Sequence, residues 1–238
     1  MTNGDGPGTG GADHRGPGAP RSPGSGGPGG GGHGRILPMF PLQAVLFPHG
    51  LLPLHVFEPR YRQMTRDCMA GDRRFGVVLI ARGSEVGGGD SRCSVGTVAR
   101  IDQAANLPDG RFALVTSGRE RLVVRQWLAD DPYPRAEVTT GPAEDPAPTT
   151  ASVRRATAAV RRAHALRSEL GHGPALPATL RLADDPAVAA WQVCDLAPVG
   201  AADRQRLLEE PDAERRLDLL CRLVEAAADD LARLLAGG

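Results

Sequence analysis

The residues best placed to do chemistry are His55 and Glu58, which lie between an apolar run and the expected start of a helix. An imidazole and a carboxylate at this spacing can act as an acid–base pair or as two ligands of a metal ion. Catalytic zinc needs three protein ligands, however, and no third ligand accompanies this pair because His49 lies in the preceding turn. The pattern favours a partly buried polar pair, so we predict no metal site and no cofactor.

Two further patterns resemble catalytic motifs without their context. Ser84 and the Ser117-Gly118-Arg119 triplet do not lie in a G-x-S-x-G elbow, so neither serine is marked as a nucleophile. Residues 83–89 have the glycine density of a phosphate-binding loop, but they precede an expected strand and contain no lysine. We interpret this segment as a hairpin loop.

All 28 basic residues are arginine, and the sequence contains no lysine. A P-loop requires a lysine at the terminal phosphates, Schiff-base enzymes require a lysine amine, and a Ser-Lys dyad requires its lysine base. These chemistries are therefore excluded within these 238 residues. We expect no catalytic residue, and we expect that a peptidase label would reflect family membership alone.

The charge balance argues against nucleic acid as the main partner. The 28 acidic residues equal the 28 arginines, whereas nucleic-acid binders usually carry a clustered positive excess. The β-rich half has 14 arginines against 11 acids, and the helical half has 12 against 15. Arg154, Arg155, Arg161 and Arg162 form two pairs on one expected helix face. This face is either solvated or a site for acidic protein segments or RNA phosphates.

Cysteine usage and hydropathy indicate the compartment. The four cysteines have no C-x-x-C spacing and no export signal precedes them, so reduced thiols in the cytoplasm are expected. No run of about 18 apolar residues is present, so we expect no membrane partner.

Composition divides the chain into four parts. Residues 1–34 contain 15 glycines and 5 prolines with no branched aliphatic or aromatic residue, which predicts a disordered tail. A β-rich domain is expected over 35–140, a Pro/Glu/Thr linker over 141–150 and a helical subdomain over 151–238.

Short apolar runs cut by glycine and proline predict the strands. They lie at 36–40, 51–57, 75–81, 95–101, 112–116, 121–128 and 135–139. Pro38, Pro41 and Pro53 cannot donate ladder hydrogen bonds, so the first strands should be irregular or at an edge. The Asp109-Gly110 pair predicts a hairpin turn.

Helical periodicity marks five other segments. One helix should begin at Pro59 and end at Gly71, after the corner that Glu58 forms. In that corner we expect Val56 and Phe57 to fill the core. Four more helices are expected at 150–170, 185–196, 201–209 and 212–235. The last carries an apolar stripe composed of Leu217, Leu220, Val224, Ala227, Leu231 and Leu234.

An ordered series of motifs resembles one known family. Residues 36–61 read ILPMFPLQAVLFPHGLLPLHVFEPRY, followed by FGVVLI at 75–80, VGTVA at 95–99 and LPDGR at 107–111. Gly118 with Arg121-Leu122, the Asp-Pro-Tyr-Pro of 131–134 and two segments of the helical half continue the series. Together they resemble the N-terminal substrate-binding domain of Lon proteases over residues 35–238.

The resemblance implies an α+β fold: a PUA-like β pseudobarrel followed by a helical bundle. It also implies a stand-alone module that lacks the ATPase and protease domains and binds unfolded or tagged polypeptides without catalysis. The candidate binding residues cluster in the quoted corner, with one on a later strand. They are Leu52, Leu54, His55, Phe57, Glu58, Arg60, Tyr61 and Arg119.

Two alternatives remain open at this point. The module can be an adaptor that docks through its helical half on a separate ATP-dependent protease or chaperone. It can also bind RNA, because PUA-like barrels often contact RNA, although the balanced charge does not indicate a basic surface.

Overall fold

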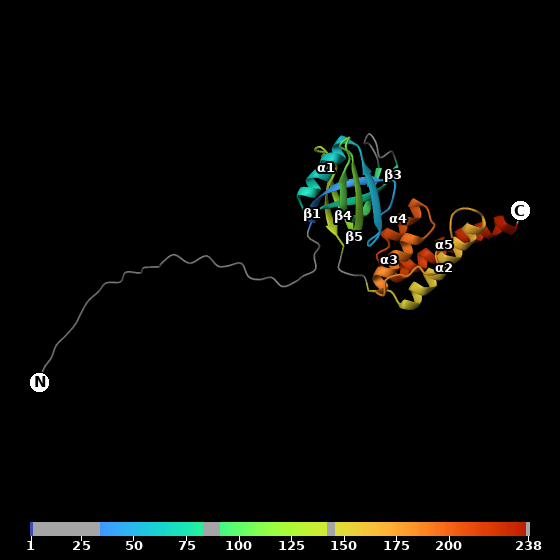
Figure 1. Cartoon of the computed structure of the whole chain (residues 1–238). Coiled ribbons are helices and arrows are strands. Elements are labelled where there is room, and N and C mark those ends of the chain that lie inside the picture. Colours follow the sequence, from blue (N-terminus) through green and yellow to red (C-terminus); the bar gives the residue numbers. More distant parts are fainter. Residues whose placement is uncertain (2–33, 83–90, 142–145, 237–238) are drawn as a thin grey trace. The chain divides into compact units, whose positions relative to one another are not determined.

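The computed structural model describes residues 34–82, 91–141 and 146–236 together with Met1 (Figure 1). The strands are β1 (Gly34–Leu42), β2 (Leu51–Val56), β3 (Arg74–Arg82), β4 (Ser91–Asn106), β5 (Phe112–Leu128) and β6 (Arg135–Thr140). The helices are α1 (Pro59–Ala70), α2 (Thr150–Glu169), α3 (Pro186–Leu196), α4 (Ala201–Glu209) and α5 (Ala213–Ala236). The predicted α+β class is confirmed. Of the tail expected over 1–34, residues 2–33 lie outside the described residues, whereas Gly34 begins β1. The glycine-rich segment at 83–89 also lies outside the described residues.

The strands of the described residues form one mixed sheet in the order β2-β5-β4-β3-β1-β6. Because β6 also pairs with β5, five of the strands close into a ring, and only β1 and β3 run parallel within it. Strand β2 lies outside the ring and pairs with the first half of β5. The expected nearly closed sheet is therefore present, with β2 as an added strand at its margin.

Strand β1 accommodates its prolines by changing partner midway. Residues 34–38 pair with β6, and residues 39–42 pair with β3. Each half of β1 thus pairs with a neighbouring strand on one side only. Pro38 and Pro41 are tolerated there, because no second strand requires hydrogen bonds from the N–H groups that they lack. The sequence predicted that the first strands are irregular or at an edge. Strand β1 is irregular, because it is divided between two neighbours, and β2 is an edge strand.

One strand was expected to be two. The runs at 112–116 and 121–128 belong to the continuous strand β5, which passes from β2 to β6 near Gly118. A Cβ atom at Gly118 would lie 2.1 Å from the Phe47 carbonyl oxygen, so this close crossing requires glycine. The polar Ser-Gly-Arg-Glu segment resembles a turn in sequence, but tertiary contact with residues 47–50 keeps it extended.

The hairpin turn predicted at Asp109-Gly110 is present, and the first helix begins and ends where the sequence predicted. The Leu107 N–H donates to the Arg111 carbonyl at 2.8 Å, and Gly110 adopts φ +77°, which closes the β4–β5 hairpin. Helix α1 begins with Pro59 and is capped by Gly71, whose N–H donates to the carbonyls of Asp67 and Cys68.

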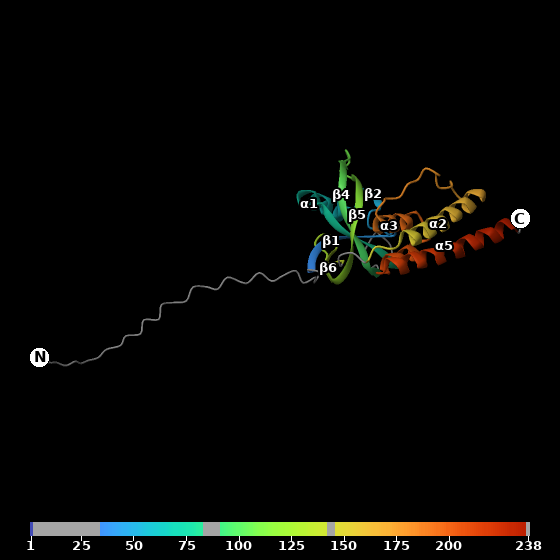
Figure 2. The same cartoon turned by 90° about the horizontal axis from the view of Figure 1, so that it is seen from below.

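Helices α2 to α5 lie within one residue of their expected bounds. Figure 2 shows α2 and α5 side by side along their length. Leu217, Leu220 and Val224 of the predicted stripe are fully buried, whereas Leu231 and Leu234 lie outside the side chains that the structure describes. No helix in the described ranges combines the length and apolarity that a bilayer crossing requires.

The two halves share one hydrophobic cluster. Val45, Phe47 and Leu79 from the β-rich half pack in the same cluster as buried residues of α2 to α5. The Phe47 ring lies 5.8 Å from that of Trp191 on α3, and Gln205 of α4 donates to the Val95 carbonyl at 3.1 Å. Residues 31–238 accordingly form one compact unit. The division into a β-rich domain over 35–140, a linker over 141–150 and a helical subdomain over 151–238 stays a prediction.

Candidate functional site

The outer edge of β2 is the first component of the site. Gly118 donates to the Gly50 carbonyl at 2.9 Å, which sets the alternation of the antiparallel ladder between β2 and β5. Consistently, the Leu52 carbonyl accepts from the Thr116 hydroxyl of β5 at 2.7 Å. The main-chain groups of Leu51, Pro53 and His55 therefore face away from β5. Among the described residues β2 pairs with no other strand, so these groups form an open edge.

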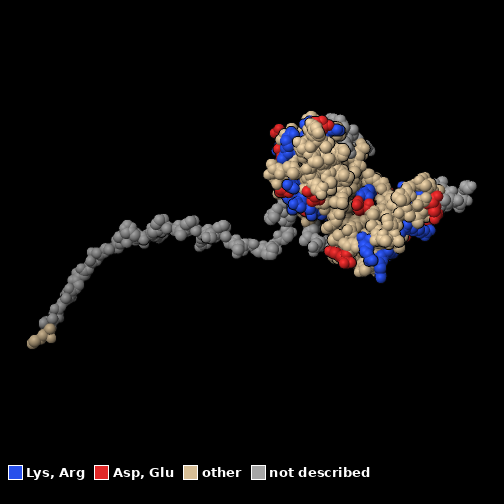
Figure 3. Space-filling view, viewed as in Figure 1, with Lys and Arg blue, Asp and Glu red and all other residues tan. Residues whose placement is uncertain are grey.

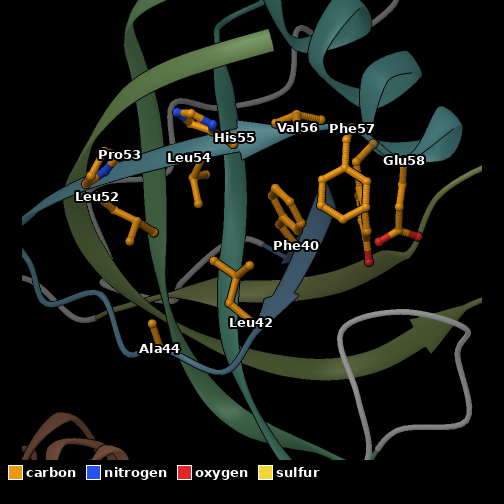
Figure 4. Close-up of a pocket in the computed structure, with 11 residues that line it drawn as sticks. Phe40, Leu42, Ala44, Leu52, Pro53, Leu54, His55, Val56, Phe57 and Glu58 are labelled. Carbon is orange, nitrogen blue, oxygen red and sulfur yellow. The ribbon is translucent and has the colours of Figure 1, made fainter. Parts of the chain in front are cut away.

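An apolar groove runs beside this edge, between β2 and β1 (Figure 4). Its volume is about 280 Å³. In Figure 4, Leu52 and Leu54 of β2 point toward Leu42 of β1, whereas His55 points away from the groove. We call this site the β1–β2 groove. It is lined by Phe40, Leu42, Ala44, Leu52, Pro53, Leu54, His55, Val56, Phe57, Glu58 and Tyr61.

Apolar side chains on and near β2 are exposed to solvent. Leu51 is 68% exposed, Phe57 is 56% exposed, and Val115, which faces Pro53 across the ladder, is 38% exposed. The expectation that Phe57 fills the core was wrong. Inward positions alternate along β2 at Leu54 and Val56, so residue 57 turns outward. The space beneath is already occupied by Phe40 and Tyr61, whose rings stack 4.2 Å apart.

One end of the groove is charged. The Arg60 Nε–H donates to the Glu58 carboxylate at 3.1 Å, and the Arg60 guanidinium lies 4.6 Å from the centre of the Tyr61 ring. Asp130 is 3.9 Å from the same guanidinium. The carboxylate and the guanidinium hold each other at the corner before α1, so this end offers both a hydrogen-bond acceptor and a donor.

The structure brings together seven of the eight residues that the sequence singled out. Leu52, Leu54, His55, Phe57, Glu58 and Tyr61 line the groove, and Arg60 lies beside it through its bond to Glu58. Arg119 does not line it. It follows the Gly118 crossing on β5, donates to Asp102 at 3.3 Å and borders a different cavity of about 500 Å³.

Sequence reasoning missed the opposite wall of the groove. Phe40, Leu42 and Ala44 come from β1 and the segment after it, and only the fold brings them against β2. The available signal was the motif at 36–61, which contains these three residues and the β2 wall in one block.

The geometry does not favour the acid–base or metal interpretation of His55 and Glu58. The imidazole points away from the groove, whereas the Glu58 carboxylate is bonded to Arg60. Within the described ranges no three His, Cys, Asp or Glu side chains gather as metal ligands would.

Two side chains of the β-rich half have strongly raised pKa values, and both lie in its core. Burial, reinforced by Asp72 and Asp67, raises the pKa of Cys68 to about 12. Burial and a hydrogen bond to Asp67 raise the pKa of Tyr133 to about 12, and its hydroxyl donates to that carboxylate at 3.0 Å. Both groups stay protonated at neutral pH, so Cys68 is a packing residue and not a nucleophile.

Comparison with known proteins assigns the sequence to a family. Residues 36–226 match the substrate-binding domain of ATP-dependent protease La (LON). The Lon protease of Xanthomonas oryzae pv. oryzae is 30% identical over 200 residues, which are 81% of this chain and 23% of that protein. The Lon protease of Escherichia coli K12 is 27% identical over 199 residues, covering 81% of this chain and 25% of that protein. The chain spans about a quarter of the length of these relatives.

Solved structures agree with the sequence matches. The Lon N-terminal domain protein from Xanthomonas campestris is similar with a TM-score of 0.58 and 30% identity, over 78% of this chain and 96% of that one. The N-terminal domain of the Mycobacterium avium complex Lon protease has a TM-score of 0.54 at 16% identity, over 80% and 98% of the two chains, and supports the fold.

Proposed function

This chain belongs to the family of Lon substrate-binding domains, and from that premise we propose that it holds extended segments of unfolded or tagged polypeptides in the β1–β2 groove. The single observation that carries this proposal is the open edge of β2 beside an apolar groove. An extended segment can add to such an edge through main-chain hydrogen bonds while alternate side chains enter the groove.

The edge itself determines how a segment would pair. Leu51 and His55 each offer a donor and an acceptor, whereas Pro53 offers only its carbonyl. A bound strand therefore makes hydrogen bonds at both ends of β2 and loses one in the middle. Proline at an edge also limits uncontrolled pairing between copies of the protein, which is a common protection of exposed strands.

The groove suits apolar side chains of modest size. About 280 Å³ is at the lower end of ligand pockets, so it fits a few side chains better than a large ligand. Phe57, which lines the groove and is largely exposed, extends this apolar surface. Unfolded proteins expose apolar residues that native proteins bury, so this surface distinguishes the two states of a substrate.

The proposed activity is binding without chemistry. The sequence has no lysine for a P-loop or a Ser-Lys dyad, and the relatives named as proteases are about four times longer than the matched region. Polypeptides are thus the proposed partners, and an ATP-dependent protease or chaperone that receives them is a further proposed partner. We also place the protein in the cytoplasm, because Cys68, Cys93, Cys194 and Cys221 are free thiols.

A pair of variants at one position tests strand addition. His55→Pro removes the outward N–H of β2 without removing a bond to β5, whereas His55→Ala keeps that N–H. Fluorescence anisotropy with labelled casein, a natively unfolded protein, measures binding. We expect His55→Pro to weaken binding about fivefold, the equivalent of roughly 1 kcal/mol for one hydrogen bond, and His55→Ala to stay within about twofold.

A groove variant separates the two parts of the mechanism. Leu52→Asp places a carboxylate in the apolar groove and should abolish casein binding, while circular dichroism reports whether the fold persists. Equal affinities of His55→Pro and His55→Ala would refute strand addition. Binding by the unaltered protein no stronger than that of an unrelated β-barrel would refute the function.

A further inference from the structure

A second groove lies on the helical half, between α2 and the segment at 177–184. Its volume is about 520 Å³. We call it the α2 groove. Val153, Leu180 and Leu182 contribute its apolar surface, and Arg154, Arg161 and Arg181 contribute three guanidinium groups. Asp184 is the one carboxylate among its described lining residues.

The four arginines that the sequence placed on one helix face divide between two surfaces. Arg154 and Arg161 line the α2 groove. Arg155 and Arg162 border a neighbouring cavity against α5, where Arg155 is paired with Asp218. The expectation of one shared face was wrong because adjacent helix positions are separated by about 100°, so the first and second members of each pair face different neighbours. Figure 3 shows arginine atoms gathered over the helical half beside acidic ones.

The arginines of the α2 groove have different roles. Arg161 donates to the carbonyls of Pro177 at 3.1 Å and Leu180 at 3.0 Å, which holds the far wall of the groove against α2. Arg154 and Arg181 are exposed, and no carboxylate within the described ranges forms an ion pair with either. One arginine thus builds the site, and two present charge at its rim.

This arrangement indicates an anionic ligand with apolar character. Two rim guanidiniums over a floor of Val153, Leu180 and Leu182 complement a carboxylate on either side of an apolar side chain. We propose that the α2 groove binds a short acidic segment of a partner protein, one in which Asp or Glu alternates with an aliphatic residue. This docking activity is separate from substrate binding in the β1–β2 groove.

Charge on the helical half favours a polypeptide over nucleic acid. The half carries 12 arginines against 15 acids, so a long polyphosphate would meet net repulsion beyond the groove. Asp184 at the groove would also oppose a phosphate. A peptide presents its charge over only a few residues, and its aliphatic side chain uses the floor that a phosphate cannot.

The test compares two double variants of equal charge. Arg154→Glu with Arg181→Glu reverses both rim charges. Arg162→Glu with Arg222→Glu makes the same change in net charge at exposed positions outside the groove. The probe is a labelled decapeptide that alternates glutamate with leucine, measured by fluorescence anisotropy on the full chain. We expect the rim variant to bind at least about tenfold more weakly, and the control to stay within about twofold of the unaltered protein.

Two further probes define the ligand class. A decapeptide of glutamate alone should bind less tightly than the alternating peptide, because it leaves the apolar floor uncovered. A single-stranded RNA of ten nucleotides should bind more weakly still. The proposal is overturned if the alternating peptide does not bind, if both double variants weaken it equally, or if glutamate alone or RNA binds as tightly. Circular dichroism on both variants checks that the helices remain folded.

Discussion

The β1–β2 groove and the α2 groove have contrasting surfaces. The first combines an open strand edge with apolar side chains, and its nearby charges, Glu58 and Arg60, neutralise each other. The second is a basic rim above an apolar floor, with Arg154 and Arg181 free of carboxylate partners in the described ranges. The first is suited to segments defined by being unfolded, and the second to segments defined by their charge. Under the two proposals, one module would hold a substrate and a partner at the same time.

The largest expected effect comes from breaking the core that both halves share. Phe47→Ala removes a fully buried ring that packs against Trp191, so it should lower the free energy of unfolding by about 3–5 kcal/mol. Urea denaturation measures this change. Binding in both grooves should weaken together, because each groove depends on the packing of the β-rich half against the helical half. The same substitution at Phe57, which is 56% exposed, is the control and should cost less than about 1 kcal/mol. Similar losses at the two positions would contradict a common core.

Salt should distinguish the two grooves next most strongly. Between 50 and 300 mM salt, screening should weaken binding of the acidic peptide to the α2 groove about fivefold, because exposed guanidiniums carry that interaction. Casein in the β1–β2 groove should change by less than about twofold, because burial of apolar surface is not screened. Anisotropy titrations at the two ionic strengths measure both. Equal salt dependence of the two probes would mean that the grooves do not differ as described.

A smaller effect should follow from replacing the arginine that holds the wall of the α2 groove. Arg161→Lys keeps the charge, but a single ammonium cannot match the planar fork that reaches both Pro177 and Leu180. We expect a loss of about 1 kcal/mol in stability and a few-fold weaker acidic peptide binding. Casein binding should not change, which makes it the internal control. Retention of peptide affinity in Arg161→Lys would show that the α2 groove does not require the two guanidinium hydrogen bonds to its wall.

The smallest expected effect concerns acidification of the helical half. Hydrogen bonds from the Ser152 hydroxyl and the Thr149 N–H lower the pKa of Glu214, which joins the start of α2 to α5. A lowered folded-state pKa means that this contribution is complete above the ordinary value of 4.5 and is lost as pH falls through the folded-state pKa. Thermal unfolding of Glu214→Gln should therefore lose part of the decline in stability that the unaltered protein shows below that pH. Identical pH profiles would contradict the role of Glu214, and Glu225→Gln on the exposed face of α5 is the control.

Arginines of the helical half and of β5 make contacts that lysine could not make. Arg216 is 1% exposed and donates to the carbonyls of Glu210 and Pro211 while its guanidinium lies 3.6 Å from the centre of the Trp191 ring. Arg121 reaches across from β5 to the carbonyls of Leu208 and Glu210. A guanidinium can bridge two carbonyls and stack on a ring at once, which an ammonium cannot do. Arginine thus satisfies main-chain acceptors at the end of α4 and joins it to its neighbours.

Local patterns predicted most of the elements because their causes are local. Helix ends followed from Pro59, Gly71 and helical periodicity, and the β4–β5 turn followed from Asp109-Gly110. The division of β5 into two strands was wrong because contact with residues 47–50, distant in sequence, keeps the Gly118 segment extended. The outward position of Phe57 was missed for a similar reason, since Phe40 and Tyr61 already fill the space beneath it.

The sequence alone excluded lysine-dependent chemistry within these 238 residues, and it determined where the helices begin and end and which family's motifs are present. Each of these depends on residue type and short spacing, which the sequence contains directly. The tertiary structure decided that β2 has an open edge, that Phe40 and Leu42 line the groove beside it, and that Arg119 lies elsewhere. It also separated Arg154 from Arg155 onto different surfaces. Such relations depend on which strands pair and which helices pack together. No short segment selects those arrangements, because they follow from burial of the apolar surface of the whole chain.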